Sequence, residues 1–394
     1  MTSTALAARP HHDDSELGAL ADLAAQGFGG AVTRVEELHQ AVADRSFGPG
    51  AAAPRAAHDA IASTVYKTVR GAGSLLGRAL ATAVRASGGG PRLSDHPRGR
   101  LAQGALNGFY GDRLDASGSP LAVPMTIRVA GEDVEPAGFP DATGRPVVLV
   151  HGLCESDTAW SIRAEARGGT YATRVLQPLG LTPVTIRYNT GLPIAENGRR
   201  LSELLERLLD QWPQPIDHLA LVGHSMGGLV IRSAAHAAAD AGHRWPEQVD
   251  TTISLGTPHL GAPLEQAAHL AAHALNALPE SRPAGVVLDA RSLGIKDLRR
   301  GLRDEVPLIP TARHHVVAAT LTQSDKHPVA RVIGDFLVLT PSAHGLQGRR
   351  SVIAFEEDSR RHVGGHDHFD LLNSPALDEH LREWLEPARL PSGG

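Results

Sequence analysis

One serine stands in a setting that can make it a nucleophile. Ser225 lies in the segment Gly223-His224-Ser225-Met226-Gly227, directly after the apolar run at 219–222. A serine between a buried strand and a helix takes a strained conformation that exposes its hydroxyl, and the flanking glycines give the turn room. The helix expected to follow, residues 226–239, contains no proline. The pattern therefore predicts a strand, a tight turn with Ser225 at its tip, and a helix.

A serine hydroxyl needs a base, a group that orients the base, and donors for the developing oxyanion. The apolar run at 146–150 is typical of a buried parallel strand, and His151-Gly152-Leu153 follows at its end. We predict that the backbone amides of Leu153 and Met226 form the oxyanion hole. The side chain of His151 either supports this loop or is an ordinary surface histidine.

The expected chain order of the remaining groups is an acid followed by a histidine. Asp335 interrupts the apolar stretch 332–338, where an unpaired carboxylate would be costly, so we expect a histidine N–H as its partner. The alternative for Asp335 is a turn or cap. A last strand is expected at 351–355, and His368 in the following loop is the predicted general base.

Two other histidines, His362 and His366, compete with His368. Together with Asp367 they also suggest a metal site. We predict no metal there, because this glycine-broken loop lacks the helical or Cys-x-x-Cys spacing of common zinc ligands.

Taken in order, these motifs resemble the lipase and esterase branch of the α/β-hydrolase superfamily, over roughly residues 120–386. The segment Gly256-Thr257-Pro258-His259-Leu260-Gly261 is similar to that of triacylglycerol lipases and the GPI inositol-deacylase-like group, where it borders the active site. The resemblance favours His368 as the base, because the family's histidine precedes a Phe-Asp-Leu-Leu-like segment. The chain departs from the lipase pattern at Phe336-Leu337, where a glycine turn and valine are more usual.

The elements around these motifs predict an α/β fold, with a mostly parallel central sheet and helices on both faces. Further strands are expected at 125–129, 182–187, 249–255 and 314–321. Between two of them, leucines recur at helical spacing along one face, which we assign to the core: Leu201, Leu204, Leu205, Leu208 and Leu209.

The length of 394 residues exceeds what a hydrolase domain requires, and we divide the chain into four parts. Residues 1–14 are expected to be disordered, 15–119 to be a helical N-terminal extension, 120–386 to be the catalytic domain, and 387–394 to be a flexible tail. Within the extension, a basic amphipathic helix is expected at about 58–86. It could contact a membrane surface peripherally, pack on the hydrolase domain, or join subunits in a homo-oligomer.

The connection between the strands at 249–255 and 314–321 is long enough to hold a cap or lid within 262–306. The apolar stretch 267–275 is either part of such a lid or an ordinary packing helix. By proximity to the motifs, Trp160 and Leu260 are predicted walls of the substrate pocket.

Composition limits the partners and the setting. The formal net charge of −5 and the lack of basic-aromatic runs argue against a nucleic-acid partner. The only cysteine, Cys154, is either a small apolar filler or, beside the oxyanion loop, a redox switch. No secretory signal or stretch of about 18 apolar residues is visible, so a cytoplasmic protein is expected.

These observations predict a serine carboxylic-ester hydrolase, an esterase or lipase that acts on small-molecule or lipid acyl esters. Ser225 attacks, His368 moves the proton and Asp335 holds the imidazole, with no cofactor required. One alternative is an acyltransferase with the same triad. The other is a non-catalytic ligand-binding protein on a hydrolase fold.

Overall fold

The computed structural model describes residues 97–262, 292–302, 306–328, 330, 334–348 and 350–386, together with positions 16, 19, 67 and 95. By contacts, the chain divides into two units, of which the second comprises residues 94–117 and 122–394. This second unit contains every helix and strand described below. The expected helix at about 58–86 and most of the predicted lid lie outside the described residues.

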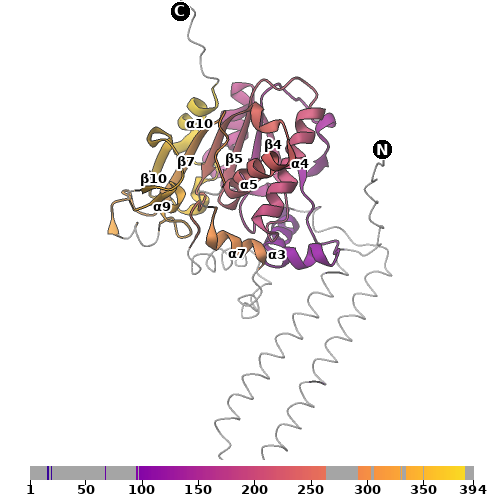
Figure 1. The fold of residues 1–394 in the computed structure, drawn as a ribbon, viewed down its shortest axis with the longest axis horizontal. Helices are drawn as coiled ribbons and strands as arrows, with labels where there is room; N and C mark the ends of the chain where they lie inside the picture. Colours follow the sequence, from indigo (N-terminus) through magenta and orange to yellow (C-terminus); the bar gives the residue numbers. More distant parts are fainter. Residues whose placement is uncertain are drawn as a thin grey trace, which may run out of the picture. The chain divides into compact units, whose positions relative to one another are not determined.

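The second unit is built on an eight-stranded sheet in the order β10-β7-β6-β5-β3-β4-β1-β2 (Figure 1). Adjacent strands from β10 to β4 run parallel, and β1 pairs antiparallel with both β4 and β2. The strands are β1 Thr126–Val129, β2 Glu132–Val134, β3 Pro146–Val150, β4 Thr182–Arg187, β5 Leu219–His224, β6 Val249–Leu255, β7 Arg313–Thr320 and β10 Arg360–Gly364. This arrangement confirms the mostly parallel α/β class predicted from the sequence.

Helices cover both faces of this sheet. The α-helices are α3 Pro97–Ala116, α4 Ile194–Gln211, α5 Met226–Ala241, α7 Leu293–Arg300, α9 Thr340–Ala343 and α10 Asp378–Leu385. Helices α4 and α5 pack against each other in front of the sheet in Figure 1, while α3 and α7 lie side by side at one edge. The leucine stripe of α4 faces the core as predicted, since Leu201, Leu204, Leu205 and Leu208 are buried.

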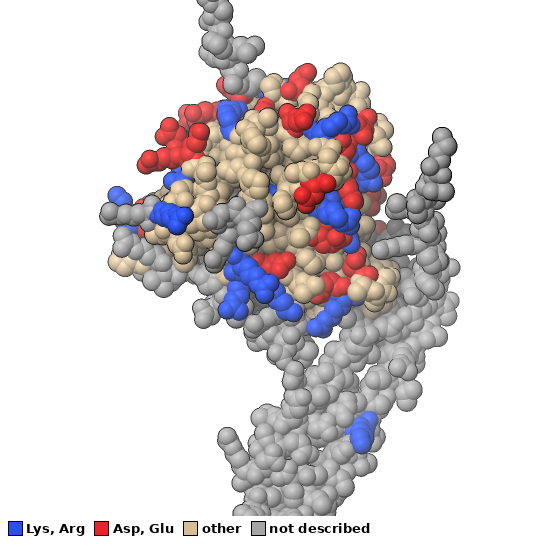
Figure 2. Space-filling model, in the orientation of Figure 1, with Lys and Arg blue, Asp and Glu red and all other residues tan. Residues whose placement is uncertain are grey.

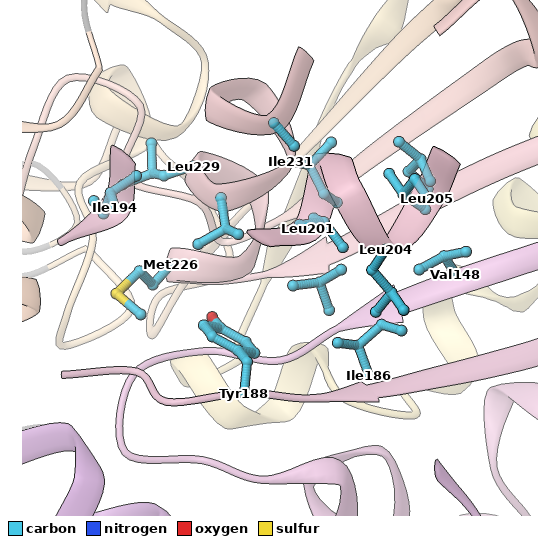
Figure 3. Close-up of a cluster of buried hydrophobic side chains, with 14 of the residues drawn as sticks. Val148, Ile186, Tyr188, Ile194, Leu201, Leu204, Leu205, Met226, Leu229 and Ile231 are labelled. Atoms are coloured by element: carbon cyan, nitrogen blue, oxygen red, sulfur yellow. The ribbon is translucent and has the colours of Figure 1, made fainter. Parts of the chain in front are cut away.

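The larger core cluster lies between the sheet and helices α4 and α5 (Figure 3). Alternate strand residues such as Val148 and Ile186 point into it, as the twofold repeat of a β-strand requires. Met226, the first residue of α5, belongs to this cluster and is fully buried. The start of the helix that follows Ser225 is therefore anchored in the core.

The opposite face of the sheet carries a second core cluster. Val147, Leu149 and Val222 alternate along their strands with residues of the first cluster. They pack against side chains of α10 and of the segment that precedes it. Trp160 belongs here, with 6% of its surface exposed. Strands buried on both faces explain the nearly continuous apolar runs of β3 and β5.

The expected last strand at 351–355 is wrong. Only Arg350–Ser351 pairs as a strand, β9, in a small hairpin with β8, Leu346–Gln347. Ile353 and Phe355 instead pack on Val316 of β7 as a small core cluster. The last strand of the main sheet is β10, which carries His362 and pairs parallel with β7. As an edge strand it has only partly buried residues, so it lacks the apolar pattern of a central strand.

The boundary expected at residue 120 also differs from the structure. Helix α3 groups with the sheet-bearing unit, which begins at about Ser94. Its glycines allow a close approach: a Cβ on Gly104 would lie 2.6 Å from the carbonyl oxygen of Glu155, in the loop after β3. Helix α3 is thus part of the layer around the predicted oxyanion loop rather than of a separate extension.

The described surface carries both signs of charge. Figure 2 shows basic and acidic side chains interspersed over the face in view. Among the described residues, no helix combines the length and apolar character needed to cross a lipid bilayer.

Candidate active site

Ser225 occupies a strained turn between β5 and α5. Its backbone has φ 53° and ψ −123°, a conformation that a non-glycine residue adopts only at a cost. The turn is tight on both sides, because a Cβ on Gly227 would lie 2.1 Å from the carbonyl oxygen of Val150, and one on Gly223 would lie 2.4 Å from the amide nitrogen of Gly228. The strand, turn and helix agree with the geometry predicted for a nucleophile elbow.

The loop after β3 approaches the serine closely. Strands β3 and β5 are parallel neighbours, so their carboxyl ends meet at the same edge of the sheet. A Cβ on Gly152 would lie 2.8 Å from the Cβ of Ser225. Leu153 follows Gly152 in the chain and Met226 follows Ser225, and both side chains are buried. The two residues predicted to supply oxyanion-hole amides are therefore the chain neighbours of the two residues that approach each other here.

His151 supports this loop. Its side chain is fully buried, stacks on the ring of Tyr188 and has Nδ1 3.0 Å from the carbonyl oxygen of Gly152. The Tyr188 hydroxyl donates to the carbonyl oxygen of His151. Burial lowers the pKa of His151, so the neutral ring is favoured. Of the two interpretations of His151, the structure favours the supporting one.

Asp335 and His368 form a buried pair. Nδ1 of His368 lies 2.8 Å from Oδ2 of Asp335, and each side chain is 1% exposed. The other carboxylate oxygen of Asp335 accepts from the amides of Leu337 and Val338, at 2.9 and 2.7 Å. Nε2 of His368 is buried and, among the described residues, has no hydrogen-bond partner. This is the arrangement in which a carboxylate orients an imidazole and leaves the other nitrogen available as a base.

Backbone contacts bring the His368 turn beside the serine elbow. The Ser225 amide donates to the carbonyl oxygen of Leu255, the last residue of β6. The next residue, Gly256, has φ 61°, and a Cβ there would lie 3.1 Å from Nδ1 of His368. His224, the neighbour of Ser225, has its ring centroid 4.8 Å from that of His368. The sequence-distant residues Ser225, Asp335 and His368 are thus collected at one edge of the sheet.

The turn that carries His368 is fixed by charge. Asp367 caps the short helix His368–Leu371, with its side chain accepting from the Asp370 amide and the Asp370 side chain accepting from the Asp367 amide. Arg163 donates to both carboxylates, and Arg167 donates to Asp370 and to the carbonyl oxygens of Asp370 and Leu372. Arg163 and Arg167 therefore stabilise the backbone turn that carries His368.

Phe336 marks the departure from the lipase pattern. Its φ is 82°, in the left-handed region that favours glycine, and 52% of its surface is exposed. The structure retains the turn that glycine would favour and accommodates a phenylalanine in it. Hydrogen bonds from two backbone amides to Asp335 therefore close this loop, although phenylalanine disfavours the φ that Phe336 adopts.

Sequence reasoning missed Glu155. Its carboxylate is buried in the oxyanion loop, accepts from the Gly152 amide at 2.6 Å, and lies 2.9 Å from Nδ1 of His224. No pattern in the sequence pairs the two residues: Glu155 lies just after the His151-Gly152-Leu153 segment that follows β3, and His224 ends the adjacent strand β5. The structure brings them together directly behind the serine.

The two predicted pocket walls have other surroundings. Trp160 is a core residue of the second cluster, and its carbonyl oxygen accepts from Asn373, which contradicts its prediction as a pocket wall. Nearness in sequence to the motifs was not enough to predict its position, because Trp160 belongs to the core cluster on the opposite face of the sheet from Met226. Leu260 packs against the small cluster on β7, and its amide donates to Ser342.

Cys154 is a buried free thiol, and burial raises its pKa well above the ordinary value. Its Sγ packs against α3, because a Cβ on Gly108 would lie 2.2 Å from that sulfur. A thiol in this state behaves as an apolar filler, which favours that interpretation over a redox switch.

His362 and His366, the two alternatives to His368 as the base, have other hydrogen-bond partners. His362 lies in β10 with Nε2 2.7 Å from the hydroxyl of Thr320. His366 bonds to the Gly364 carbonyl oxygen and the Ser374 hydroxyl. Within the described parts of the chain, no group of three or more His, Cys, Asp or Glu residues is placed to hold a metal ion.

Comparisons with known proteins agree with this architecture. Residues 141–285 match the family model described as a PGAP1-like alpha/beta domain. A search of curated proteins gave no match.

Three of the solved structures that are similar to this chain are hydrolases by their names. The mature form of Bacillus licheniformis lipase BlEst2 is 19% identical, with 64% of this chain and 96% of that chain covered and a TM-score of 0.42. RedJ, a thioesterase from the prodiginine biosynthetic pathway of Streptomyces coelicolor, is 18% identical, with 64% and 96% covered and a TM-score of 0.38. The ester-hydrolase EH1AB1 from the metagenome of Lake Arreo is 14% identical, with 77% and 93% covered and a TM-score of 0.39.

The fold that the sequence resemblance implied is confirmed. The parallel sheet order, the elbow after β5 and the family match over residues 141–285 all agree with it. The chain has the α/β-hydrolase fold of the lipases and esterases, and its residues 141–285 match the PGAP1-like alpha/beta domain.

Proposed function

We propose that this chain is a serine carboxylic-ester hydrolase that works through an acyl-enzyme. The observation that carries the proposal is the buried His368–Asp335 hydrogen bond, which leaves Nε2 of His368 without a partner among the described residues, beside the strained turn of Ser225. A buried imidazole held in one tautomer by a carboxylate is the base that a serine nucleophile requires.

In the first half of the reaction, Nε2 of His368 takes the proton of the Ser225 hydroxyl while Oγ attacks the ester carbonyl carbon. Asp335 accepts from Nδ1 and stabilises the imidazolium that forms. The carbonyl oxygen becomes an oxyanion, for which the amides of Leu153 and Met226 are the proposed donors. The imidazolium then protonates the leaving alcohol, and the acyl group remains on Ser225.

In the second half, water takes the place of the alcohol. His368 removes a proton from the water as its oxygen attacks the acyl-enzyme, and a second tetrahedral intermediate forms in the same oxyanion hole. Its collapse releases the carboxylic acid and returns the proton from His368 to Ser225. The chemistry is complete with residues of this chain and water.

The substrate class proposed is a small-molecule or lipid acyl ester. The second core cluster occupies the face of the sheet on which Trp160 lies, so Trp160 is not proposed as a substrate contact. A lid within residues 262–306, a helical N-terminal extension and a cytoplasmic setting also belong to this proposal.

The test is hydrolysis of p-nitrophenyl esters from acetate to palmitate by the full-length protein and by Ser225→Ala. We expect turnover by the wild type and a loss of at least about 10³-fold in the variant, because removal of the nucleophile removes the acyl-enzyme route. The preferred chain length separates esterase from lipase.

The folded state of both proteins is checked by circular dichroism, so that lost activity is not lost structure. Equal turnover by Ser225→Ala would contradict the serine mechanism. Added alcohols that convert the product from acid to new ester would favour acyl transfer, and absence of turnover by a folded wild type would favour ligand binding without catalysis.

A further inference from the structure

A buried carboxylate and a buried histidine lie behind the catalytic groups and are not used in the chemistry proposed above. Glu155 is 7% exposed and His224 is fully buried. They connect two parts of the site that belong to different elements: the oxyanion loop after β3 and the turn that carries His368. The role of this connection in the site rests on the proposed function.

The hydrogen bonds fix where the protons of His224 are. Nδ1 is hydrogen-bonded to Oε2 of Glu155 at 3.1 Å, with Oε1 at an ion-pair distance of 2.9 Å, and Nε2 lies 3.2 Å from the carbonyl oxygen of His368. A carbonyl oxygen only accepts, so Nε2 must donate. An ionised carboxylate also only accepts, so Nδ1 must donate as well, which makes His224 an imidazolium.

The electrostatic surroundings agree with this assignment. Burial alone would raise the pKa of Glu155, but the charge of His224 and the hydrogen bonds from His224 and Gly152 outweigh it and lower that pKa. Burial alone would lower the pKa of His224, but Glu155, the His368 carbonyl and the charge of Asp335 outweigh it and raise that pKa. Two other imidazoles lie near the pair: His151, whose pKa burial lowers, and His368, whose ring centroid is 4.8 Å from that of His224.

The chain of contacts therefore runs from one catalytic element to the other. The Gly152 amide donates to Glu155, Glu155 accepts from His224, and His224 donates to the backbone of His368. Gly152 lies against Ser225 and precedes Leu153, whose amide is a proposed oxyanion donor. Each of the three bonds involves Glu155 or His224, and a charge on either partner strengthens a hydrogen bond.

We propose that Glu155 and His224 are a positioning pair, a buried carboxylate–imidazolium bridge that holds the oxyanion loop in register with the backbone of the catalytic histidine. Neither side chain reaches the reacting atoms. The pair acts through Gly152 and His368, so its loss displaces the oxyanion donors relative to the base.

The first test measures the charge of His224 directly. In protein labelled with ¹⁵N-histidine, two-bond ¹H–¹⁵N correlations distinguish an imidazolium from a neutral ring, and the signal of His224 is the one absent from His224→Gln. At pH 7.5 a histidine of ordinary pKa is about 90% neutral. We expect His224 to show both ring nitrogens protonated in the wild type and to become neutral in Glu155→Gln. A neutral His224 in the wild type would overturn the proposal.

The second test separates positioning from packing by kinetics on the ester series. Glu155→Ala removes the bridge, and a displaced oxyanion loop is expected to lower kcat about 100-fold with KM within about twofold. Glu155→Gln can still accept from Gly152 and donate to a neutral His224, whose Nε2–H still reaches His368. We expect this conservative variant to restore kcat to within about tenfold of wild type.

Glu206→Gln is the matched control. Its carboxylate also accepts backbone amides, those of Arg244 and Trp245 at 2.8 and 3.0 Å, but on α4 away from the site. We expect a lower melting temperature with an unchanged kcat. A folded Glu155→Ala with wild-type kcat, or with its whole defect in KM, would overturn the positioning role. If the wild type hydrolyses no ester, the proposed function fails, while the NMR result still decides whether the charged bridge exists.

Discussion

At the scale of single residues, Asp335 serves two tasks with its two carboxylate oxygens. Oδ1 accepts from the amides of Leu337 and Val338, which closes its own loop, and Oδ2 accepts from His368. A carboxylate has an acceptor oxygen on each side, whereas the side-chain amide of asparagine has only one. Asp335 therefore shapes its loop and orients the His368 ring at once, and this explains how the loop tolerates Phe336 with φ 82°.

Asp335→Asn tests this division. Two amides donate to Oδ1, so the amide oxygen of asparagine keeps that side and its NH₂ faces His368. That group would donate to Nδ1, forcing the imidazole proton onto Nε2, and the ring could no longer act as a base. We expect kcat for ester hydrolysis to fall about 10⁴-fold with little change in melting temperature.

The control for Asp335→Asn is Asp141→Asn, a substitution of the same kind on an exposed residue of the described chain. It should retain wild-type kcat. Retention of more than about a tenth of wild-type kcat by Asp335→Asn would show that another carboxylate orients His368.

A second residue-scale prediction concerns Cys154. Because the thiol is buried and its pKa is raised, little thiolate exists at neutral pH, and the thiolate is the reactive form. We expect iodoacetamide at pH 8 to leave the native protein unmodified, as measured by intact mass, while the urea-unfolded protein is alkylated fully. Rapid modification of the folded protein, with loss of ester turnover, would revive the redox-switch interpretation.

Some residues of the site could be predicted from the sequence and others could not, for physical reasons. Ser225 was predictable because its turn demands glycines at fixed positions, and Asp335 because a carboxylate in an apolar stretch needs a partner. Glu155 was not, since it lies in a loop whose neighbours are mixed in polarity. Only the parallel pairing of β3 with β5 shows that this loop lies beside His224.

At the scale of elements, the elbow depends on how closely α5 approaches β3. The carbonyl oxygen of Val150 would be 2.1 Å from a Cβ on Gly227, and it belongs to a buried strand that cannot shift without breaking its pairing on both sides. Gly223 is constrained in the same way by the first turn of α5. The glycines thus set the distance between the central strands and the helix that begins after the nucleophile.

Gly227→Ala is expected to destabilise the protein by at least about 3 kcal/mol, because the added methyl group must displace backbone rather than a flexible side chain. Chemical unfolding followed by circular dichroism measures this. Gly138→Ala is the matched control, since Gly138 is exposed and a Cβ there meets nothing within 4 Å. Equal midpoints for the two variants would show that the elbow can widen without cost.

The strands differ in how clearly their own residues predict them. Strands β3, β4 and β6 are predicted to the residue. Strand β3 is apolar throughout, as a central strand covered on both faces can be, while β4 and β6 are rich in the valine, isoleucine and threonine that favour strands. The edge strand β10 has the sequence Arg-Arg-His-Val-Gly, and its pairing with β7 comes from the sheet rather than from its own pattern. The apolar residues 352–355 led to the wrong prediction of a last strand. They are apolar because they pack on β7 from a loop.

At the scale of the whole molecule, the described core holds several buried histidines whose pKa is lowered by burial. These are His151, His259, His314 and His344, with His315 lowered to about 3. The ring nitrogens of His259 and His315 have no hydrogen-bond partner among the described residues. Such rings are neutral in the folded state, whereas in the unfolded chain they take up protons near pH 6.5.

The sign of the pH dependence follows from this difference. A histidine with a lowered folded pKa stabilises the fold above its unfolded pKa of about 6.5, and that contribution is lost as the pH falls toward the folded value. The raised pKa of His224 acts in the opposite direction, and its contribution is lost as the pH rises. The lowered pKa of Glu155 matters only at about pH 4.5 and below. Several lowered histidines against one raised histidine give a net loss of stability on acidification.

We therefore expect the free energy of unfolding to fall between pH 7 and pH 5, and His259→Leu to make that fall shallower. His259 is fully buried, and burial followed by repulsion from Arg232 lowers its pKa. Removing one such titration reduces the slope by up to about 1.4 kcal/mol per pH unit below pH 6.5, whatever the substitution does to stability at pH 8. Urea unfolding at each pH measures the slope. His218→Leu is the control, because His218 is partly exposed and pairs with Asp250, so its removal leaves the acid-side loss from the buried rings in place. An unchanged slope in His259→Leu would mean that His259 is protonated with similar ease in the folded and unfolded chains, and the acid sensitivity would then have to come from the remaining buried rings.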